Sequence, residues 1–193
     1  MPVIKYRQSV EKLLEKPVIL ARDFVKLKIK RSYVRRLAEL LRKRGRITSV
    51  EKGKYATVDD PFLVAPFLTF PSYISMFSAL FLRKALMQIP DEIQVVTTAR
   101  RKKRVVNFRG AELKFFRIKP ELFFGYEFIP YEGYRIPVAN VEKAIIDLAY
   151  FGFEPGGELS GNVDLERLES YLKLVKRKSV IERVKRWLGA PGK

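Results

Sequence analysis

The sequence predicts an α+β fold, with a basic and mostly helical N-terminal part followed by a part with a mostly antiparallel sheet. Apolar residues recur at helical spacing along residues 4–46. In residues 93–138, short runs rich in β-branched and aromatic residues alternate with glycine, proline or charged breaks, as strands do. With 193 residues, of which 47% are hydrophobic, the chain is long and apolar enough to bury a core, which argues against disorder.

The first elements are expected to be helices. Ile4–Glu15 is amphipathic, and Ile19–Leu27 is a shorter apolar-periodic segment. A basic link, residues 28–31, joins it to a longer helix expected from Ser32 onward, with Ser32 as its N-cap and Gly45 just past its end. The apolar face of this longer helix is expected to consist of Val34, Leu37, Ala38 and Leu41.

Two β-branched runs, Arg46–Val50 and Lys54–Val58, flank Glu51-Lys52-Gly53 and predict a β-hairpin. Helix, tight turn, second helix and hairpin is the order of a winged helix-turn-helix unit, whose second helix enters the major groove of DNA. Because that helix is basic on its outer face, we expect residues 1–58 to form a winged helix-turn-helix domain that binds double-stranded DNA. Two other interpretations stay open: a winged unit used for protein contacts, and a basic face that is only solvated.

The expected DNA contacts come from the basic link, the helix and the tip of the hairpin. Arg35 and Arg36 would reach base edges, because a guanidinium group can bond guanine at two atoms, while lysines would hold phosphates. The full set is Lys28, Lys30, Arg31, Ser32, Tyr33, Arg35, Arg36, Lys43, Lys52 and Lys54.

Positive charge is concentrated in the same segment. The chain carries 39 Lys or Arg and 21 Asp or Glu, a formal charge of +18. Residues 1–58 hold 17 basic and 5 acidic residues, a net +12, which leaves +6 for residues 59–193. Such a distribution is typical of a surface that binds phosphates. A membrane surface is the rival partner for a basic patch, but the sequence carries no lipidation signal.

Composition excludes several chemistries. There is no Cys and no His, so disulfides, cysteine zinc sites, imidazole catalysis and cysteine nucleophiles are all excluded. Residues 62–82 form an uncharged run of 21 residues, the length of a membrane span. Pro66, Pro71 and five hydroxyl-bearing residues favour instead an apolar linker that enters a buried helix. Since the N-terminus lacks an apolar signal region, we expect a cytoplasmic protein.

The turn Asp59-Asp60-Pro61 is the expected domain boundary, so that residues 59–193 form an α+β domain of their own. The helices expected after this turn are Tyr73–Met87, capped by Ser72, then Asn140–Tyr150, Asp164–Val175 and Ser179–Leu188. The expected strands, mostly linked by hairpins, are Ile93–Thr98, Arg104–Phe108, Leu113–Ile118, Phe123–Ile129 and Tyr134–Val138.

Two further groups of residues could carry chemistry. Five consecutive cations occupy an expected β-turn and are either solvated charges or a surface for DNA, RNA or an acidic partner: Arg100, Arg101, Lys102, Lys103 and Arg104. Asp91, Glu112 and Lys114 match the Pro-Asp…Glu-x-Lys signature of a nuclease superfamily, in which two carboxylates hold Mg²⁺ and a lysine helps to activate water. So short a motif arises often by chance. We therefore expect no catalytic residue, metal or cofactor, with a nuclease as the alternative.

Four segments follow the expected winged unit in order: PSYISMFSAL (Pro71–Leu80), VVTTARRKK (Val95–Lys103), FFRIKPELFFGYE (Phe115–Glu127) and IPVANVEKAIIDL (Ile136–Leu148). Together they resemble the antitoxin of the abortive-infection E system, a type IV toxin–antitoxin family of antiviral defence. The resemblance covers nearly the whole chain to about Leu148.

The resemblance implies an N-terminal winged domain that represses its own operon through inverted repeats. It also implies a C-terminal domain that counters a nucleotidyltransferase-like toxin without forming a stable complex with it, and it implies no catalytic residues. Another interpretation stays open beside it, a stand-alone transcription factor whose C-terminal domain responds to a small molecule.

Overall fold

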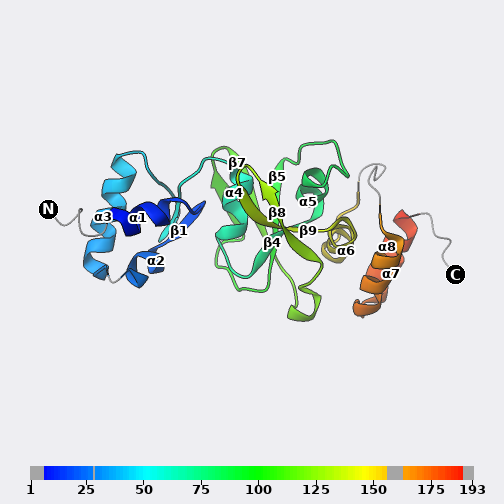
Figure 1. Cartoon of the computed structure of the whole chain (residues 1–193). Coiled ribbons are helices and arrows are strands. Elements are labelled where there is room, and N and C mark those ends of the chain that lie inside the picture. Colours follow the sequence, from blue (N-terminus) through cyan, green and yellow to red (C-terminus); the bar gives the residue numbers. More distant parts are fainter. Residues whose placement is uncertain (1–6, 28, 156–162, 189–193) are drawn as a thin grey trace.

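The computed structural model describes residues 7–27, 29–155 and 163–188, which form an α+β protein (Figure 1). The described strands make two sheets, one of three strands and one of six. The three-stranded sheet and its helices lie at one end of the molecule, the six-stranded sheet lies in the middle, and the last two helices lie at the other end.

The N-terminal part contains three helices and three short strands. In chain order these are α1 (Arg7–Leu14), β1 (Val18–Leu20), α2 (Ala21–Lys26), α3 (Arg31–Lys43), β2 (Thr48–Glu51) and β3 (Lys54–Ala56). The strands are antiparallel in the order β1-β3-β2, so β2 and β3 form the expected hairpin and β1 pairs with the far side of β3. The segment Ile19–Leu27 therefore begins in a strand and becomes helical only at Ala21.

Helix α3 packs against the other elements of the N-terminal part through the expected apolar face. The apolar side chains of this face are buried in one cluster with Phe24 of α2, and they are Val34, Leu37, Ala38 and Leu41. Gly45 follows the helix with φ +66°, and it ends the helix as expected because glycine adopts this left-handed conformation without strain.

The start of α3 differs from the prediction. The backbone N–H groups of Tyr33 and Val34 both donate to the carbonyl of Lys30, which makes Lys30 the N-cap. Ser32 lies inside the first turn, so the prediction that Ser32 caps the helix is wrong. Its side chain is exposed there.

The six-stranded sheet has the order β6-β7-β5-β4-β9-β8. Its strands are β4 (Ser72–Ile74), β5 (Glu92–Thr97), β6 (Val105–Phe108), β7 (Ala111–Arg117), β8 (Tyr126–Tyr131) and β9 (Tyr134–Ala139). The pairs β4/β5, β6/β7 and β8/β9 are antiparallel, whereas β5/β7 and β4/β9 are parallel. The expected strands are confirmed within a few residues, but hairpins alone do not build the sheet, because parallel neighbours need crossover connections.

The helix expected over Tyr73–Met87 is wrong at both ends. Ser72–Ile74 form the central strand β4, and α5 spans only Met76–Leu82, with Ser75 as its N-cap. Every side chain of residues 72–76 is buried. An apolar run of this kind fits a central strand and a buried helix equally well, and here the pairing of β4 with β5 and β9 decides.

The remaining helices and 3-10 turns belong to the part of the chain that contains the larger sheet. They are α4 (Pro61–Val64), η1 (Ala65–Phe67), η2 (Pro120–Leu122), α6 (Val141–Phe151), α7 (Leu165–Leu174) and α8 (Lys178–Trp187). Helices α5 and α6 contact each other, and α7 and α8 pack on the side of α6 that faces away from the sheet (Figure 1). Asn140 caps α6 as expected, since its side chain accepts the N–H of Lys143 at 3.0 Å.

The buried apolar side chains form two clusters. The smaller one lies among α1, α2 and α3, and the larger one fills the space between the six-stranded sheet and its helices. Val18 and Ala56 of the small sheet belong to the larger cluster, so the two parts share a border of packed side chains. The uncharged run 62–82 is divided among α4, η1, β4 and α5, and no described helix is long and apolar enough to cross a membrane.

Candidate nucleic-acid interface

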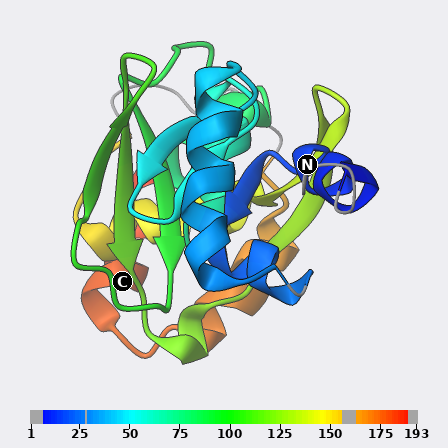
Figure 2. The same ribbon diagram turned by 90° about the vertical axis from the view of Figure 1, so that its left-hand side faces the viewer.

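The outer face of α3 carries exposed cations. Arg35, Arg36 and Lys43 are exposed, and of these only Arg35 has an ion pair with a described residue, Glu39, at 3.5 Å. The helix is in the foreground of Figure 2, which looks onto this end of the molecule. The guanidinium groups of Arg35 and Arg36 are therefore open to solvent on this face.

The remaining predicted contacts around α3 have different environments. Lys30 is exposed, whereas Tyr33 is half-buried and packs against the smaller hydrophobic cluster, which gives its ring a structural role. Lys28 and the side chain of Arg31 lie outside the part of the chain that the structure describes.

At the hairpin, the two predicted lysines differ. Lys52 is exposed at the tip. Lys54 is half-buried, and its Nζ atom donates to the carboxylate of Glu51 at 2.7 Å and to the carbonyl of Leu68. Lys54 was expected to hold a phosphate; in the structure its ammonium shares the carboxylate of Glu51 with Arg101, so the three groups together keep one positive charge.

The basic turn, Arg100–Arg104, packs against this hairpin through one residue. The Arg101 guanidinium donates to Glu51 at 2.9 Å and to the Leu68 carbonyl at 3.1 Å, and it lies over the ring of Phe115 at 3.7 Å. Its side chain is only 7% exposed. The run of five cations is therefore divided, since Arg101 is a buried anchor while Arg100, Lys102, Lys103 and Arg104 are exposed.

Glu51 is the counter-charge of this junction. Burial alone would raise the pKa of Glu51, but hydrogen bonds from Lys54 and Arg101, together with their charges, outweigh it and hold the pKa below its usual value. The carboxylate is thus ionised at neutral pH. It joins β2 to the basic turn, two segments that are 50 residues apart in the chain.

Two hollows lie along this junction. The larger, the hairpin hollow of about 340 Å³, is lined by Glu51, Lys52, Lys54, Thr69 and Arg100–Lys103. A second hollow of about 200 Å³ is lined by Thr97, Ala99, Arg100, Arg101, Arg104, Phe115 and Arg117. Among these described lining residues, Glu51 is the one carboxylate, and its charge is already paired, so both hollows favour anions.

The nuclease pattern has a different arrangement from the one expected. In the parallel pair β5/β7, Glu112 lies opposite Glu92, and Lys114 forms ion pairs with both, at 3.1 Å to Glu112. Hydrogen bonds to Glu92 and then Glu112 raise the pKa of Lys114. Asp91 is exposed before β5 and has no ion pair or hydrogen bond with these residues. Within the described residues, no group of three or more acidic side chains is placed to hold a metal ion.

Sequence reasoning missed a buried polar cluster between β4 and α6. Asp147 accepts from the hydroxyls of Tyr73 at 3.0 Å and Ser75 at 2.7 Å, and it forms an ion pair with Lys143 one turn earlier. The side chains of Lys143 and Asp147 are 0% exposed. Burial, and then the charge of Asp147, raise the pKa of Tyr73 well above its usual value. The i, i+4 spacing of Lys143 and Asp147 is visible in the sequence, but such pairs normally lie on solvated faces.

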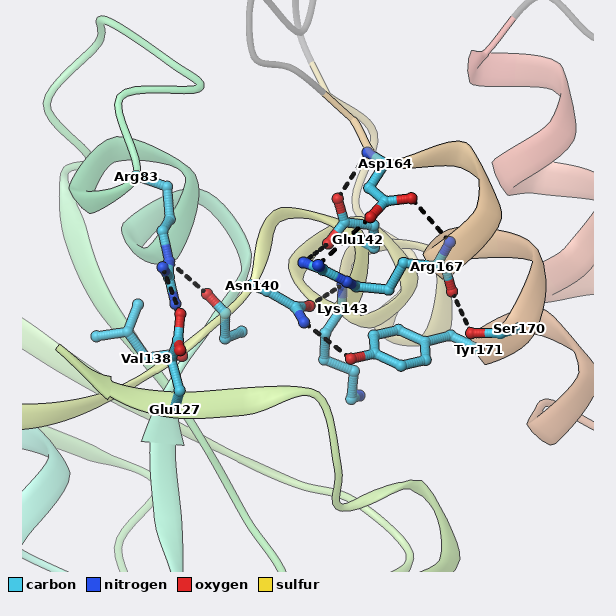
Figure 3. A network of polar contacts seen from close by, with 11 residues as sticks. Arg83, Glu127, Val138, Asn140, Glu142, Lys143, Asp164, Arg167, Ser170 and Tyr171 are labelled. Atoms are coloured by element: carbon cyan, nitrogen blue, oxygen red, sulfur yellow. Dashed lines mark hydrogen bonds and ion pairs between the residues drawn. The ribbon is translucent and has the colours of Figure 1, made fainter.

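A second polar group attaches α7 to the start of α6 (Figure 3). The Asn140 side chain donates to the Tyr171 hydroxyl at 2.9 Å. Glu142, which is almost fully buried, accepts the N–H of Asp164 at 2.8 Å and lies 3.6 Å from the Arg167 guanidinium. The second carboxylate oxygen of Glu142 accepts no hydrogen bond from a described residue and has only the ion pair with Arg167, while the other contacts hold α7 against α6.

The fold and these surfaces define an α+β protein with a cationic helix face at one end and a cationic junction between its two sheets. No protein-family model matches the chain, and no curated protein matches it.

Proposed function

We propose that the protein is a DNA-binding transcriptional regulator and that α2, α3 and the β2–β3 hairpin act as a winged helix-turn-helix unit. The observation that carries the proposal is the exposed basic face of α3, with Arg35, Arg36 and Lys43, on a helix that is followed by a hairpin with Lys52 at its tip. In such units the second helix enters the major groove while the hairpin contacts phosphates. The net charge of +12 on residues 1–58 supports the same function.

The test is a titration of operator DNA with the full chain carrying Arg36→Ala. If Arg36 contacts a base, this variant loses about 1–3 kcal/mol of specific binding free energy and discriminates less between sequences. Arg186→Ala is the matched control, because Arg186 is exposed on α8 at the opposite end of the molecule. Full affinity and selectivity of the Arg36 variant, measured by gel shift, would contradict the assignment of α3.

We further propose that the regulator is the autorepressing antitoxin of a type IV toxin–antitoxin system, which counters a nucleotidyltransferase-like toxin in the cytoplasm. The support is the resemblance of four ordered segments. Two of them supply the buried polar cluster, since Tyr73 and Ser75 come from the first and Lys143 and Asp147 from the fourth. The motifs that carry the resemblance thus include residues on which the core depends.

Rescue of cells that express the partner toxin tests this second proposal. We expect residues 59–193 to supply protection, with the exposed cations of the basic turn as the first candidate surface. Neutralising Arg100, Lys102, Lys103 and Arg104, but keeping the anchor Arg101, should abolish rescue if the turn acts on the toxin or its substrate. Loss of operator affinity with rescue intact would instead assign the turn to DNA binding.

A metal-dependent nuclease is the alternative function. Glu92, Glu112 and Lys114 converge on β5 and β7, which is the observation in its favour. Lys114 occupies the space between the two carboxylates, and the described residues bring no third acidic group to them, so we propose that the protein is not an enzyme. Cleavage of DNA in the presence of Mg²⁺ or Mn²⁺ that is lost with Glu112→Ala would contradict this.

A further inference from the structure

An exposed aromatic residue, Phe70, directly follows a residue that lines the hairpin hollow. The side chain of Phe70 is 82% exposed, more than any other aromatic among the exposed large apolar residues. Thr69, the residue before it, lines the hollow. The backbone of Phe70 is therefore next to a cationic depression, and exposure of so large an apolar side chain has a free-energy cost and no packing benefit.

The loop that carries Phe70 is fixed on both sides. Before it, the Leu68 carbonyl accepts hydrogen bonds from Arg101 and Lys54. After it, the Pro71 carbonyl accepts the hydroxyl of Thr97 at 2.6 Å. Because these bonds hold the backbone, the loop does not need to be ordered again when a ligand binds, which lowers the entropic cost of binding.

The charge around Phe70 is arranged for a polyanion. Lys52, Arg100, Lys102 and Lys103 line the hairpin hollow with exposed side chains. The guanidinium of their neighbour Arg101 instead donates hydrogen bonds to Glu51 and to the Leu68 carbonyl. These bonds fix the turn and so hold the other cations in place before a ligand binds. Through Arg100, which lines both hollows, the cationic surface continues to Arg104 and Arg117.

An accessible ring among cations fits a ligand that offers flat apolar faces and phosphates together. A duplex keeps the faces of its bases stacked inside, so the ring would gain little from it. A single strand exposes bases and phosphates side by side, and positive grooves with aromatic stacking platforms are how proteins hold single strands without reading their sequence.

We propose that Phe70, the hairpin hollow and the exposed cations of the basic turn form a binding site for single-stranded nucleic acid. The site shares Lys52 with the proposed wing and the exposed cations of the basic turn with the proposed protective surface, but Phe70 belongs to neither, so the proposal holds whether or not α3 binds an operator.

The test is fluorescence anisotropy of the full chain with labelled oligothymidine, oligouridine and a blunt duplex, each about a dozen nucleotides long. Phe70→Ala should weaken binding of the single strands on the order of tenfold, and Phe70→Trp should retain it, because tryptophan also stacks. Phe128→Ala is the matched control, since Phe128 is an exposed aromatic on β8 at the edge of the sheet. The double variant Lys102→Gln/Lys103→Gln should lower the slope of log affinity against log salt by about 0.7 for each phosphate that the variant no longer neutralises.

Several results would overturn the proposal: no binding of either single strand by the unmodified protein, equal affinities of Phe70→Ala and the unmodified protein, or equal losses on the duplex and the single strands. A larger Phe70 effect with oligothymidine or with oligouridine supports the site and identifies the sugar it prefers. Failure of the proposed function has a different signature, because it concerns operator binding by Arg36→Ala and leaves the Phe70 comparison unchanged.

Discussion

The pair Lys143–Asp147 in the core and the pair Arg101–Glu51 at the junction are built from similar groups at different depths. Each joins a cation to a carboxylate, and each cation lies near an aromatic ring, with the Lys143 ammonium 5.1 Å from the centre of the Phe124 ring and the Arg101 guanidinium over Phe115. The core pair is 0% exposed, whereas at the junction Glu51 is 15% exposed and opens onto a hollow.

The difference shows how depth decides what a charge can do. In the core, hydroxyls of Tyr73 and Ser75 complete the shell of Asp147, and water cannot replace a lost partner. At the junction, water in the hollow can reach a group that loses its partner. Removing one partner of the core pair, which joins β4 to α6, should therefore reduce the stability of the fold strongly. Removing one partner of the junction pair, which links the two sheets, should reduce it less.

The largest effect is expected from Lys143→Met. This change leaves Asp147 charged and buried without its cation, which should reduce the free energy of unfolding by about 3–5 kcal/mol. The measurement is urea denaturation followed by circular dichroism. The double variant Lys143→Met/Asp147→Asn removes both charges but keeps an acceptor for the hydroxyls of Tyr73 and Ser75, and it should recover part of the loss. A single variant within about 1 kcal/mol of the unmodified protein would show that the core tolerates the isolated carboxylate.

A smaller effect is expected from Arg101→Ala, which deprives Glu51 and the Leu68 carbonyl of a donor. We expect a loss of about 1–3 kcal/mol in the free energy of unfolding. Arg101→Lys should restore little, because a lysine cannot bond both acceptors and stack on Phe115 at once. Arg100→Ala, at the exposed neighbour, should stay within about 0.5 kcal/mol of the unmodified protein. Equal effects at positions 100 and 101 would contradict the division of the basic turn.

The smallest effect is expected from lowering the pH, which should weaken the stabilising contribution of Glu51 at the junction. Because the pKa of Glu51 in the folded protein lies below its ordinary value of 4.5, its contribution to stability is complete above that value and disappears as the pH falls through the folded pKa. The difference in unfolding free energy between the unmodified protein and Glu51→Gln should therefore shrink as the pH falls from about 6 to about 3. A difference that stays constant over this range would mean that Glu51 does not titrate as described.

Local patterns predicted the elements that depend on local signals. The apolar face of α3, the Asn140 cap of α6 and the hairpin with Lys52 at its tip follow from spacing and turn residues in the sequence. The predictions of secondary structure were wrong where pairing with a distant segment determines whether a segment is a strand. Ser72–Ile74 are a strand because β5 and β9 lie on either side of them, and β1 is a strand because β3 pairs with it.

The same distinction applies to the candidate sites. The exposed cations on α3 could be predicted from helical periodicity, and the basic turn from its composition. That Arg101 is an anchor, that Lys54 is occupied, and that Glu92 rather than Asp91 lies opposite Glu112 depend on pairings between distant segments. The exposure of Phe70 could not be predicted from the neighbouring sequence, because an isolated phenylalanine before a proline is normally expected to pack in the core.

The central position of β4 has a consequence for synthesis of the chain. Ile74 pairs with Val95 on one side and with Val138 on the other, so the second pairing waits until the 64 residues from 75 to 138 have been added. At the usual rates of translation this takes about 3–13 s. All strand partners of the three-stranded sheet lie within residues 18–56 and are available long before. The nascent protein thus passes through an interval in which the strand at the middle of its larger sheet still has an unpaired edge, the kind of edge that recruits strands from other chains and that chaperones shield.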